Sequence, residues 1–170
     1  MSMEYEFTLK YQLSKPYDAD ALLERLAENG CDDALIGVGQ PGRLALAFIR
    51  ESGSADEALQ SALQDVYRAI PSARLIEATP DLVGLTDVAD LIGVSRQNMR
   101  KLMLAHYSDF PAPVHEGRTS LWHLADILVW LRKRETYAIG QGVFDLAHTA
   151  MAVNISSAYD RLFGAAHSAR

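Results

Sequence analysis

The sequence contains a single cysteine, Cys31, and no long apolar run. One cysteine excludes a disulfide within the chain and a metal site built from cysteines. A membrane-spanning helix needs roughly 20 consecutive apolar residues, and no stretch approaches that length. The start, MSMEYEFTLK, carries two glutamates and lacks the apolar core of a secretory signal. With 49 % hydrophobic and 22 % charged residues, we expect a globular protein of the cytoplasm.

Basic residues are also scarce: the chain has 16 Lys and Arg against 22 Asp and Glu, which gives a net charge of -6 at pH 7. This imbalance is uneven along the chain. Residues 1–80 hold thirteen acids and seven bases, whereas residues 81–134 hold six acids and seven bases. Phosphate contacts require a local cluster of cations and do not require a net positive charge on the whole chain. Overall acidity therefore does not exclude DNA binding by the second half.

The first forty residues predict a strand, a helix and a second strand. The stretch EYEFTLKYQL (4–13) has an apolar side chain at every second position, which is typical of a half-buried strand. Leucines at helical spacing follow, with Asp18 and Asp20 at the expected helix start and Gly30 at its end. ALIGV (34–38) predicts the second strand.

The next forty residues complete the pattern. A turn containing Gly and Pro leads to the predicted strand RLALAFIR (43–50). Ser54 and Glu57 have the spacing of a capping box at a helix start, and ARLIEA (73–78) predicts a fourth strand. The order strand, helix, strand, strand, helix, strand is that of a ferredoxin-like domain, with one antiparallel sheet and both helices on one face. We assign it to residues 1–79.

No group of residues in this first half predicts catalysis. Asp32 and Asp33 lack a neighbouring histidine, so a solvated turn is the preferred interpretation. Cys31 is interpreted as a small, semi-buried residue. GQPGR (39–43) is too short for a phosphate loop and no helix follows it. RNA binding is disfavoured, because Phe48 is the one aromatic side chain of its strand and is expected in the core.

Residues 84–104, GLTDVADLIGVSRQNMRKLML, predict two short helices joined by a tight turn. Thr86 is the expected cap of the first helix, and Ser95 that of the second. Gly93 suits the left-handed conformation of the turn, and Ala89 is small where two helices approach closely. The expected inner face of the first helix consists of Val88, Leu91 and Ile92.

The second predicted helix has two different faces. The apolar face comprises Met99, Leu102, Met103 and His106. The polar residues are Arg96, Gln97, Asn98, Arg100 and Lys101. Arginine binds guanine, glutamine and asparagine bind adenine, and lysine binds phosphate or guanine. This helix therefore has the composition of one that enters the major groove of DNA.

The following residues predict a hairpin and another helix. VHEGRTSLW (114–122) has a turn at Glu116 and Gly117, with Arg118 near its tip. LADILVWLRKR (124–134) is a helix pattern with a basic end. Its expected inward residues are Leu124, Ile127, Leu128 and Leu131.

The run from 84 to 134 resembles the winged helix-turn-helix of the excisionase, phage AlpA and MerR-like group. The matching features are LTDVADLIGVSRQNMRKL, FPAPV, the Gly-Arg turn, Trp122 and ADILVWL, in that order. The resemblance implies that the second helix enters the major groove and that the wing contacts backbone or minor groove. The implied DNA contacts are Ser95, Arg96, Gln97, Asn98, Arg100, Lys101, Arg118 and Thr119, with His115 beside the wing. The stretch LMLAHYSDFP departs from the family pattern, because the segment that ends this helix is often shorter in the family.

Other activities find no support in the sequence. The metal-sensing MerR branch has cysteines downstream of this region, and this chain has none there. The five histidines lack ligand spacing, and GVSRQ is not a nucleophile elbow because Gln97 stands where glycine is needed. We expect no enzyme activity, no metal and no cofactor.

The C-terminal tail, residues 135–170, predicts a long helix at 143–163 with a break near Asn154. Its apolar stripe comprises Phe144, Ala147, Met151, Ile155, Ala158, Leu162 and Phe163. Because the tail cannot fold alone, it packs either on the rest of the chain or on a second subunit. The sequence leaves both alternatives open.

Together these patterns predict an α+β chain: a ferredoxin-like domain (1–79), a winged helix-turn-helix (80–134) and a helical tail (135–170). The hypothesis is a dimeric transcriptional regulator, a repressor that binds double-stranded DNA. The acidic first domain would bind a small ligand or a protein partner, such as the toxin of a toxin–antitoxin pair. The alternative is an interaction module or adaptor that uses the helix-turn-helix for assembly.

Overall fold

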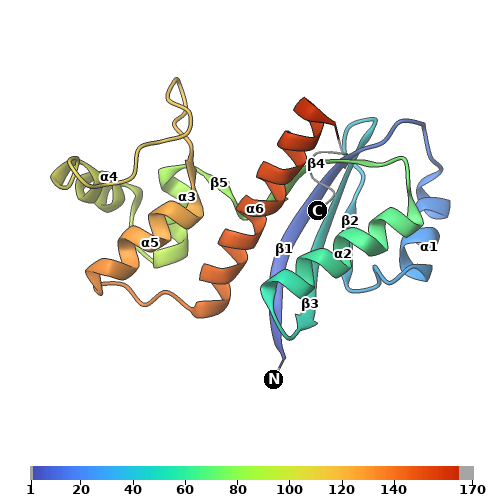
Figure 1. Cartoon of the computed structure of the whole chain (residues 1–170), viewed down its shortest axis with the longest axis horizontal. Coiled ribbons are helices and arrows are strands. Elements are labelled where there is room, and N and C mark those ends of the chain that lie inside the picture. Colours follow the sequence, from blue (N-terminus) through green and yellow to red (C-terminus); the bar gives the residue numbers. More distant parts are fainter. Residues whose placement is uncertain (1, 165–170) are drawn as a thin grey trace. The chain divides into compact units, whose positions relative to one another are not determined.

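The computed structural model describes residues 2–164 and divides into two compact units (Figure 1). The first unit contains residues up to Thr79 together with those from Ala152 onward, and the second contains Pro80–Met151. Helices and strands are mixed in an α+β chain, as predicted. Within the described residues, no helix is long and apolar enough to span a membrane.

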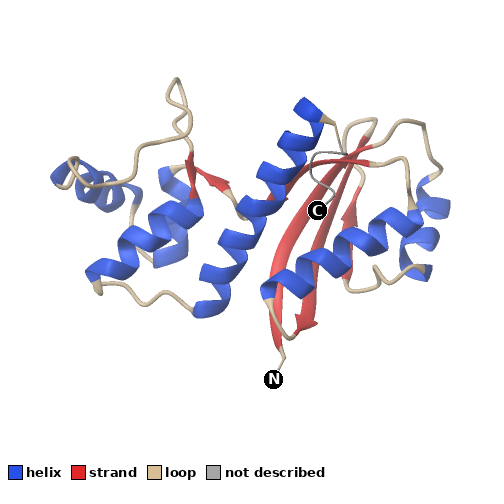
Figure 2. Ribbon diagram, in the orientation of Figure 1, coloured by secondary structure: helices blue, strands red, loops and turns tan. Residues whose placement is uncertain are grey.

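A four-stranded antiparallel sheet, in the order β2-β3-β1-β4, forms the centre of the first unit (Figure 2). Its strands are β1 (Met3–Gln12), β2 (Ala34–Gly37), β3 (Arg43–Ser52) and β4 (Arg74–Thr79). β1 pairs with β3 over ten residues, from Met3 opposite Ser52 to Gln12 opposite Arg43. The predicted alternation is confirmed, because Tyr5, Phe7, Leu9 and Tyr11 are all buried.

Two helices cover the buried face of this sheet, α1 (Ala19–Glu28) and α2 (Ala55–Ala69) (Figure 2). Both predicted caps are confirmed. The Asp18 carboxylate accepts a hydrogen bond from the N–H of Ala21 at 3.1 Å. The Ser54 hydroxyl accepts one from the N–H of Glu57 at 3.1 Å. Such caps satisfy N–H groups that have no partner within the helix.

A buried charge cluster joins the end of α1 to β3 and α2. The Arg50 guanidinium contacts the Asp33 carboxylate at 2.7 Å and the Asp65 carboxylate at 3.0 Å. It also donates to the carbonyl of Gly30 at 2.7 Å and to the hydroxyl of Ser61 at 3.0 Å. Asp32 and Asp33 lie in a turn, as expected, and Asp32 is exposed, but the Asp33 carboxylate is held in an ion pair. Its partner, Arg50, lies 17 positions away on another strand, where local sequence gives no sign of it.

Cys31 lies beside this cluster and is fully buried. Burial, with the nearby Asp65 carboxylate, raises the pKa of its thiol to about 11. A thiol with a raised pKa has little thiolate at neutral pH, and the thiolate is the reactive form. Cys31 is thus more deeply buried than the semi-buried residue that the sequence predicted.

The second unit contains a two-stranded sheet and four helical segments. Its elements are β5 (Leu82–Val83), α3 (Leu85–Ile92), α4 (Arg96–Ala105), β6 (Trp122–His123), α5 (Leu124–Arg134) and the first half of α6 (Gln141–Phe163). β5 pairs antiparallel with β6. The four residues of α5 expected to point inward are all buried. Next to this sheet, the buried Asp81 carboxylate lies 2.6 Å from the His123 imidazole and positions the start of α5.

Helix α6 is continuous from Gln141 to Phe163, so the predicted break near Asn154 is wrong. The Asn154 side chain instead bonds to the edge strand β4. Its amide oxygen accepts from the N–H of Ala78 at 2.7 Å, and its amide nitrogen donates to the same residue's carbonyl at 2.8 Å. The side chain thereby satisfies the two backbone groups of one residue on an edge strand.

Candidate nucleic-acid interface

Helix α3 supports the candidate DNA-binding helix. It begins after Gly84, whose N–H donates to the Asp87 carboxylate at 2.9 Å. Thr86 lies within the first turn, so its predicted capping role is wrong. Val88 is fully buried, as predicted, but Leu91 is exposed. Adjacent helix positions differ by about 100°, and Ile92 takes the inward place next to Leu91.

The turn between α3 and α4 has the predicted form. Gly93 adopts a left-handed conformation with φ of 76°, which glycine accepts without steric cost. The N–H of Val94 donates to the carbonyl of Ala89 at 3.0 Å. The Ser95 hydroxyl caps α4 by accepting from the N–H of Asn98 at 3.1 Å. These contacts fix where α4 begins and therefore which side chains face outward.

The inner face of α4 packs on the core of the second unit. Met99 is fully buried, and Leu102 and Met103 are partly buried against the core. α4 ends at Ala105, and the ring of His106 lies 5.7 Å from that of Trp130. One face of the helix is thus held by apolar contact, as the sequence predicted.

The outer face of α4 collects the residues expected to contact DNA. Those residues are Ser95, Arg96, Gln97, Asn98, Arg100 and Lys101, and all six are exposed. Within residues 2–164, the side chains of Arg96, Gln97, Arg100 and Lys101 form no hydrogen bond or ion pair. The sequence has no carboxylate between Asp90 and Asp109 to neutralise the three cations. This face is free to bind an anionic partner.

The basic end of α5 is engaged elsewhere in the unit. The Arg132 guanidinium lies 3.6 Å from the centre of the Phe144 ring. The Arg134 guanidinium lies 4.8 Å from the Trp130 ring centre and contacts the His106 ring nitrogen at 3.0 Å. Cation–π contacts of this kind stabilise packing. We therefore infer that these two arginines stabilise the packing of the second unit and do not belong to the interface.

The predicted hairpin at Glu116 and Gly117 is reduced to a single bridge. His115 pairs with Leu121, and the N–H of Leu121 donates to the carbonyl of His115 at 3.0 Å. Five residues, 116–120, form the loop between them, and Arg118 and Thr119 are exposed in it. The expected second strand is short because its continuation, β6, pairs with β5.

Two tryptophans hold the segment that leads from α4 to this loop. The Trp122 indole N–H donates to the carbonyl of Pro111 at 2.9 Å, and that of Trp130 donates to the Asp109 carboxylate at 3.2 Å. The Phe110 ring packs edge-on against both. Buried indoles normally need an acceptor, but sequence spacing does not say which one. The longer stretch after α4 is therefore ordered and anchored in the core.

The candidate residues occupy two places in the second unit: the outer face of α4 and the loop 116–120. Comparison with protein-family models, with curated proteins and with solved structures found no match to this chain. Among the residues that the structure describes, no group of three or more His, Cys, Asp or Glu could hold a metal ion.

Proposed function

We propose that the chain is a sequence-specific DNA-binding transcriptional regulator. In this proposal, residues 80–134 form a winged helix-turn-helix, and residues 1–79 form a ferredoxin-like partner or sensor domain. The observation that carries it is the outer face of α4: Arg96, Gln97, Arg100 and Lys101 are exposed, and their side chains form no hydrogen bond or ion pair within residues 2–164. Long polar side chains without partners are suited to bind an external, polar, anionic surface.

The side chains divide between base and phosphate contacts by their chemistry. Gln97, Asn98 and Arg100 offer the amide and guanidinium groups that pair with adenine and guanine edges. Arg96 and Lys101 supply positive charge for phosphates. The amino end of α4, capped by Ser95, adds backbone N–H groups that favour an anion. Arg118 in the loop 116–120 would anchor the wing on the backbone or in the minor groove.

The second half of α6 supports a dimer of this regulator. Ile155 and Leu162 are seven residues apart and are 52 % and 74 % exposed. Seven residues are two turns, so both side chains lie on one face, with Ala152 and Ala158 exposed near them. A seven-residue apolar spacing suits pairing with another helix, and the same face on a second copy is self-complementary. Two copies would bind half-sites about one helical turn apart.

The alternative is a protein-binding module, and two exposed apolar side chains favour it. Leu104 near the end of α4 is 54 % exposed, and Tyr107 just after it is 83 % exposed. Aromatic side chains are enriched at protein interfaces. This reading places a protein partner on α4, whereas an antitoxin version of the first proposal places a toxin on the acidic first domain.

A selection from random duplex DNA tests the proposal. Wild type, the Gln97→Ala/Arg100→Ala double variant and Arg25→Ala are incubated with the library at two salt concentrations. Arg25→Ala is the matched control, because it removes one exposed cation from α1. We expect a paired half-site motif with wild type and the control, weaker recovery at higher salt, and loss of the motif in the double variant.

Two other outcomes count against DNA recognition. Enrichment of the same motif by the double variant would exclude α4 as the helix that recognises the DNA sequence. Absence of any motif with folded wild type would favour the protein-binding module. That alternative then predicts that Tyr107→Ala weakens capture of a protein partner.

A further inference from the structure

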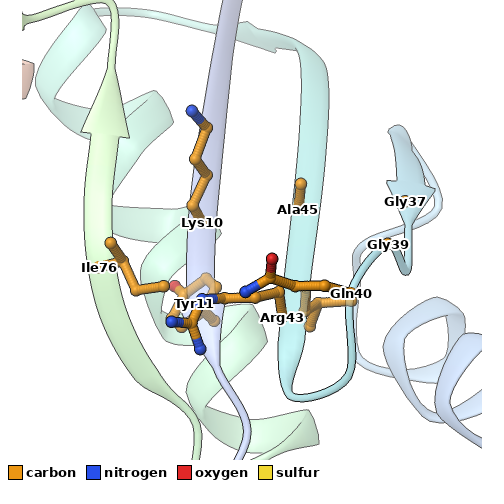
Figure 3. Close-up of a pocket in the computed structure, with 9 residues that line it drawn as sticks. Lys10, Tyr11, Gly37, Gly39, Gln40, Arg43, Ala45 and Ile76 are labelled. Carbon is orange, nitrogen blue, oxygen red and sulfur yellow. The ribbon is translucent and has the colours of Figure 1, made fainter.

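A hollow of about 400 Å³ lies beside the turn that joins β2 to β3 (Figure 3). Binding pockets for small molecules start at about 300 Å³. The hollow belongs to the first unit and shares no residue with the candidate DNA interface. Its lining includes Lys10, Gly37, Gln40, Arg43, Ala45 and Ile76.

The floor of the hollow includes two small residues on neighbouring strands, one on β2 and one on β3. Gly37 lies opposite Ala45, and Ala45 lies opposite Lys10. Glycine and alanine leave the space above the sheet unfilled. A Cβ placed on Gly37 would have only the Ala45 carbonyl near it, at 4.0 Å, and one on Gly39 would meet nothing within 4 Å. The hollow is therefore open space that a larger side chain would fill without a clash.

A β-bulge in β4 supplies an apolar wall. Lys10 lies opposite Glu77, but the next residue, Tyr11, lies opposite Leu75, which leaves Ile76 without a partner. An extra residue of this kind changes the direction of neighbouring side chains. Ile76 is exposed and lines the hollow, while the Glu77 carboxylate accepts from the Lys10 ammonium group at 3.1 Å.

The turn places two polar side chains at the rim. The carbonyl of Gln40 accepts from the N–H of Arg43 at 3.1 Å, and between them Gly42 has φ of 79° after Pro41. Pro followed by a glycine with positive φ defines a type II turn. Gln40 and Arg43 are thus held at its two ends, close together. The Arg43 side chain makes no ion pair or hydrogen bond within residues 2–164.

We propose that this hollow binds a small monocarboxylate with a short apolar body. Glu77 neutralises Lys10, so Arg43 supplies the remaining positive charge. The guanidinium fork of arginine matches a carboxylate, and Gln40 adds an amide donor. Ile76 and the methyl group of Ala45 contact the apolar body. The site is independent of DNA binding and would let the acidic domain sense a ligand.

Amide NMR shifts of the full chain, titrated with hexanoate and with hexanamide, test this proposal. We expect saturable shifts at Gly39, Gln40, Arg43 and Ala45 with hexanoate, and binding at least about tenfold weaker with the uncharged hexanamide. Gly37→Val should abolish the shifts by filling the space, with unfolding at or above the wild-type temperature, because valine suits a strand better than glycine.

Arg43→Gln tests the charge alone and should weaken hexanoate binding by about tenfold or more. Arg25→Gln is its control and should bind as wild type does. The proposal is overturned by absent shifts with hexanoate, by equal binding of both probes, or by unchanged binding in Arg43→Gln. None of these outcomes depends on DNA, so the regulator proposal stands or falls separately.

Discussion

At the scale of single residues, neighbouring side chains on α4 are expected to differ in what they recognise. Arg100 and Lys101 are adjacent, exposed and of equal charge. The planar guanidinium can bind two acceptors on one guanine, whereas the ammonium group of lysine acts as a point charge. Equal charge therefore does not imply equal sequence preference.

We predict that Arg100→Ala reduces the difference in affinity between the selected duplex and a random one by roughly 1–3 kcal/mol. Lys101→Ala should instead weaken binding to both duplexes equally. It should also lower the slope of log affinity against log salt concentration by about 0.9. Fluorescence anisotropy at several salt concentrations measures both quantities. Identical behaviour of the two variants would contradict the assignment of bases to one and phosphates to the other.

The buried thiol of Cys31 gives a prediction about pH. Burial raises its pKa from 9.0 to about 11, so the folded chain holds this proton more tightly than the unfolded chain. The resulting stability is complete below pH 9 and is lost as the pH rises to about 11. The difference in free energy of unfolding between wild type and Cys31→Ala should shrink over that interval. Urea unfolding measures it, and a pH-independent difference would contradict the raised pKa.

At the scale of elements, the end of α1 depends on one glycine. Gly30 has φ of 98°, and a Cβ there would lie 2.7 Å from the Asp65 carboxylate. Gly30→Ala should therefore lower the free energy of unfolding by more than about 1 kcal/mol, since strained backbone and a displaced ion pair both contribute. Gly39→Ala is the control, because its Cβ meets nothing within 4 Å. Equal stability of the two variants would refute this reason for the glycine.

The elements themselves were predictable, whereas several contacts between them were not. Period-two alternation, Asp18, Ser54 and Ser95 located strands and helix starts, because caps and alternation are local properties. Arg50 with Asp33, and Asn154 with Ala78, join positions far apart in the sequence. Local sequence patterns do not indicate which distant residues will pair.

The candidate site was partly predictable for the same reason. Exposure of the polar face of α4 follows from the burial of Met99 and the Ser95 cap. The hairpin was predicted too long, because pairing of β6 with β5 depends on a strand forty residues earlier. The ligand hollow was not predicted, since it requires the bulge at Ile76 in addition to the glycine turn.

At the scale of the whole molecule, the proposed dimer links the tail to DNA affinity. Replacing Ile155 and Leu162 together by glutamate places charges on the exposed apolar face of α6. We expect the double variant to be monomeric by sedimentation and to bind a paired site no better than a single half-site. Its single-half-site affinity should equal that of wild type. Unchanged dimerisation would exclude this face as the interface.

Hydrogen exchange of the full chain, measured with and without the selected duplex, tests directly whether α4 and the loop 116–120 contact DNA. We expect protection from hydrogen exchange at residues 95–101 and in the loop 116–120, with the first domain unchanged. The Gln97→Ala/Arg100→Ala variant should lose this protection while staying folded. Protection confined to residues outside these two segments would contradict the proposal that α4 and the loop contact DNA.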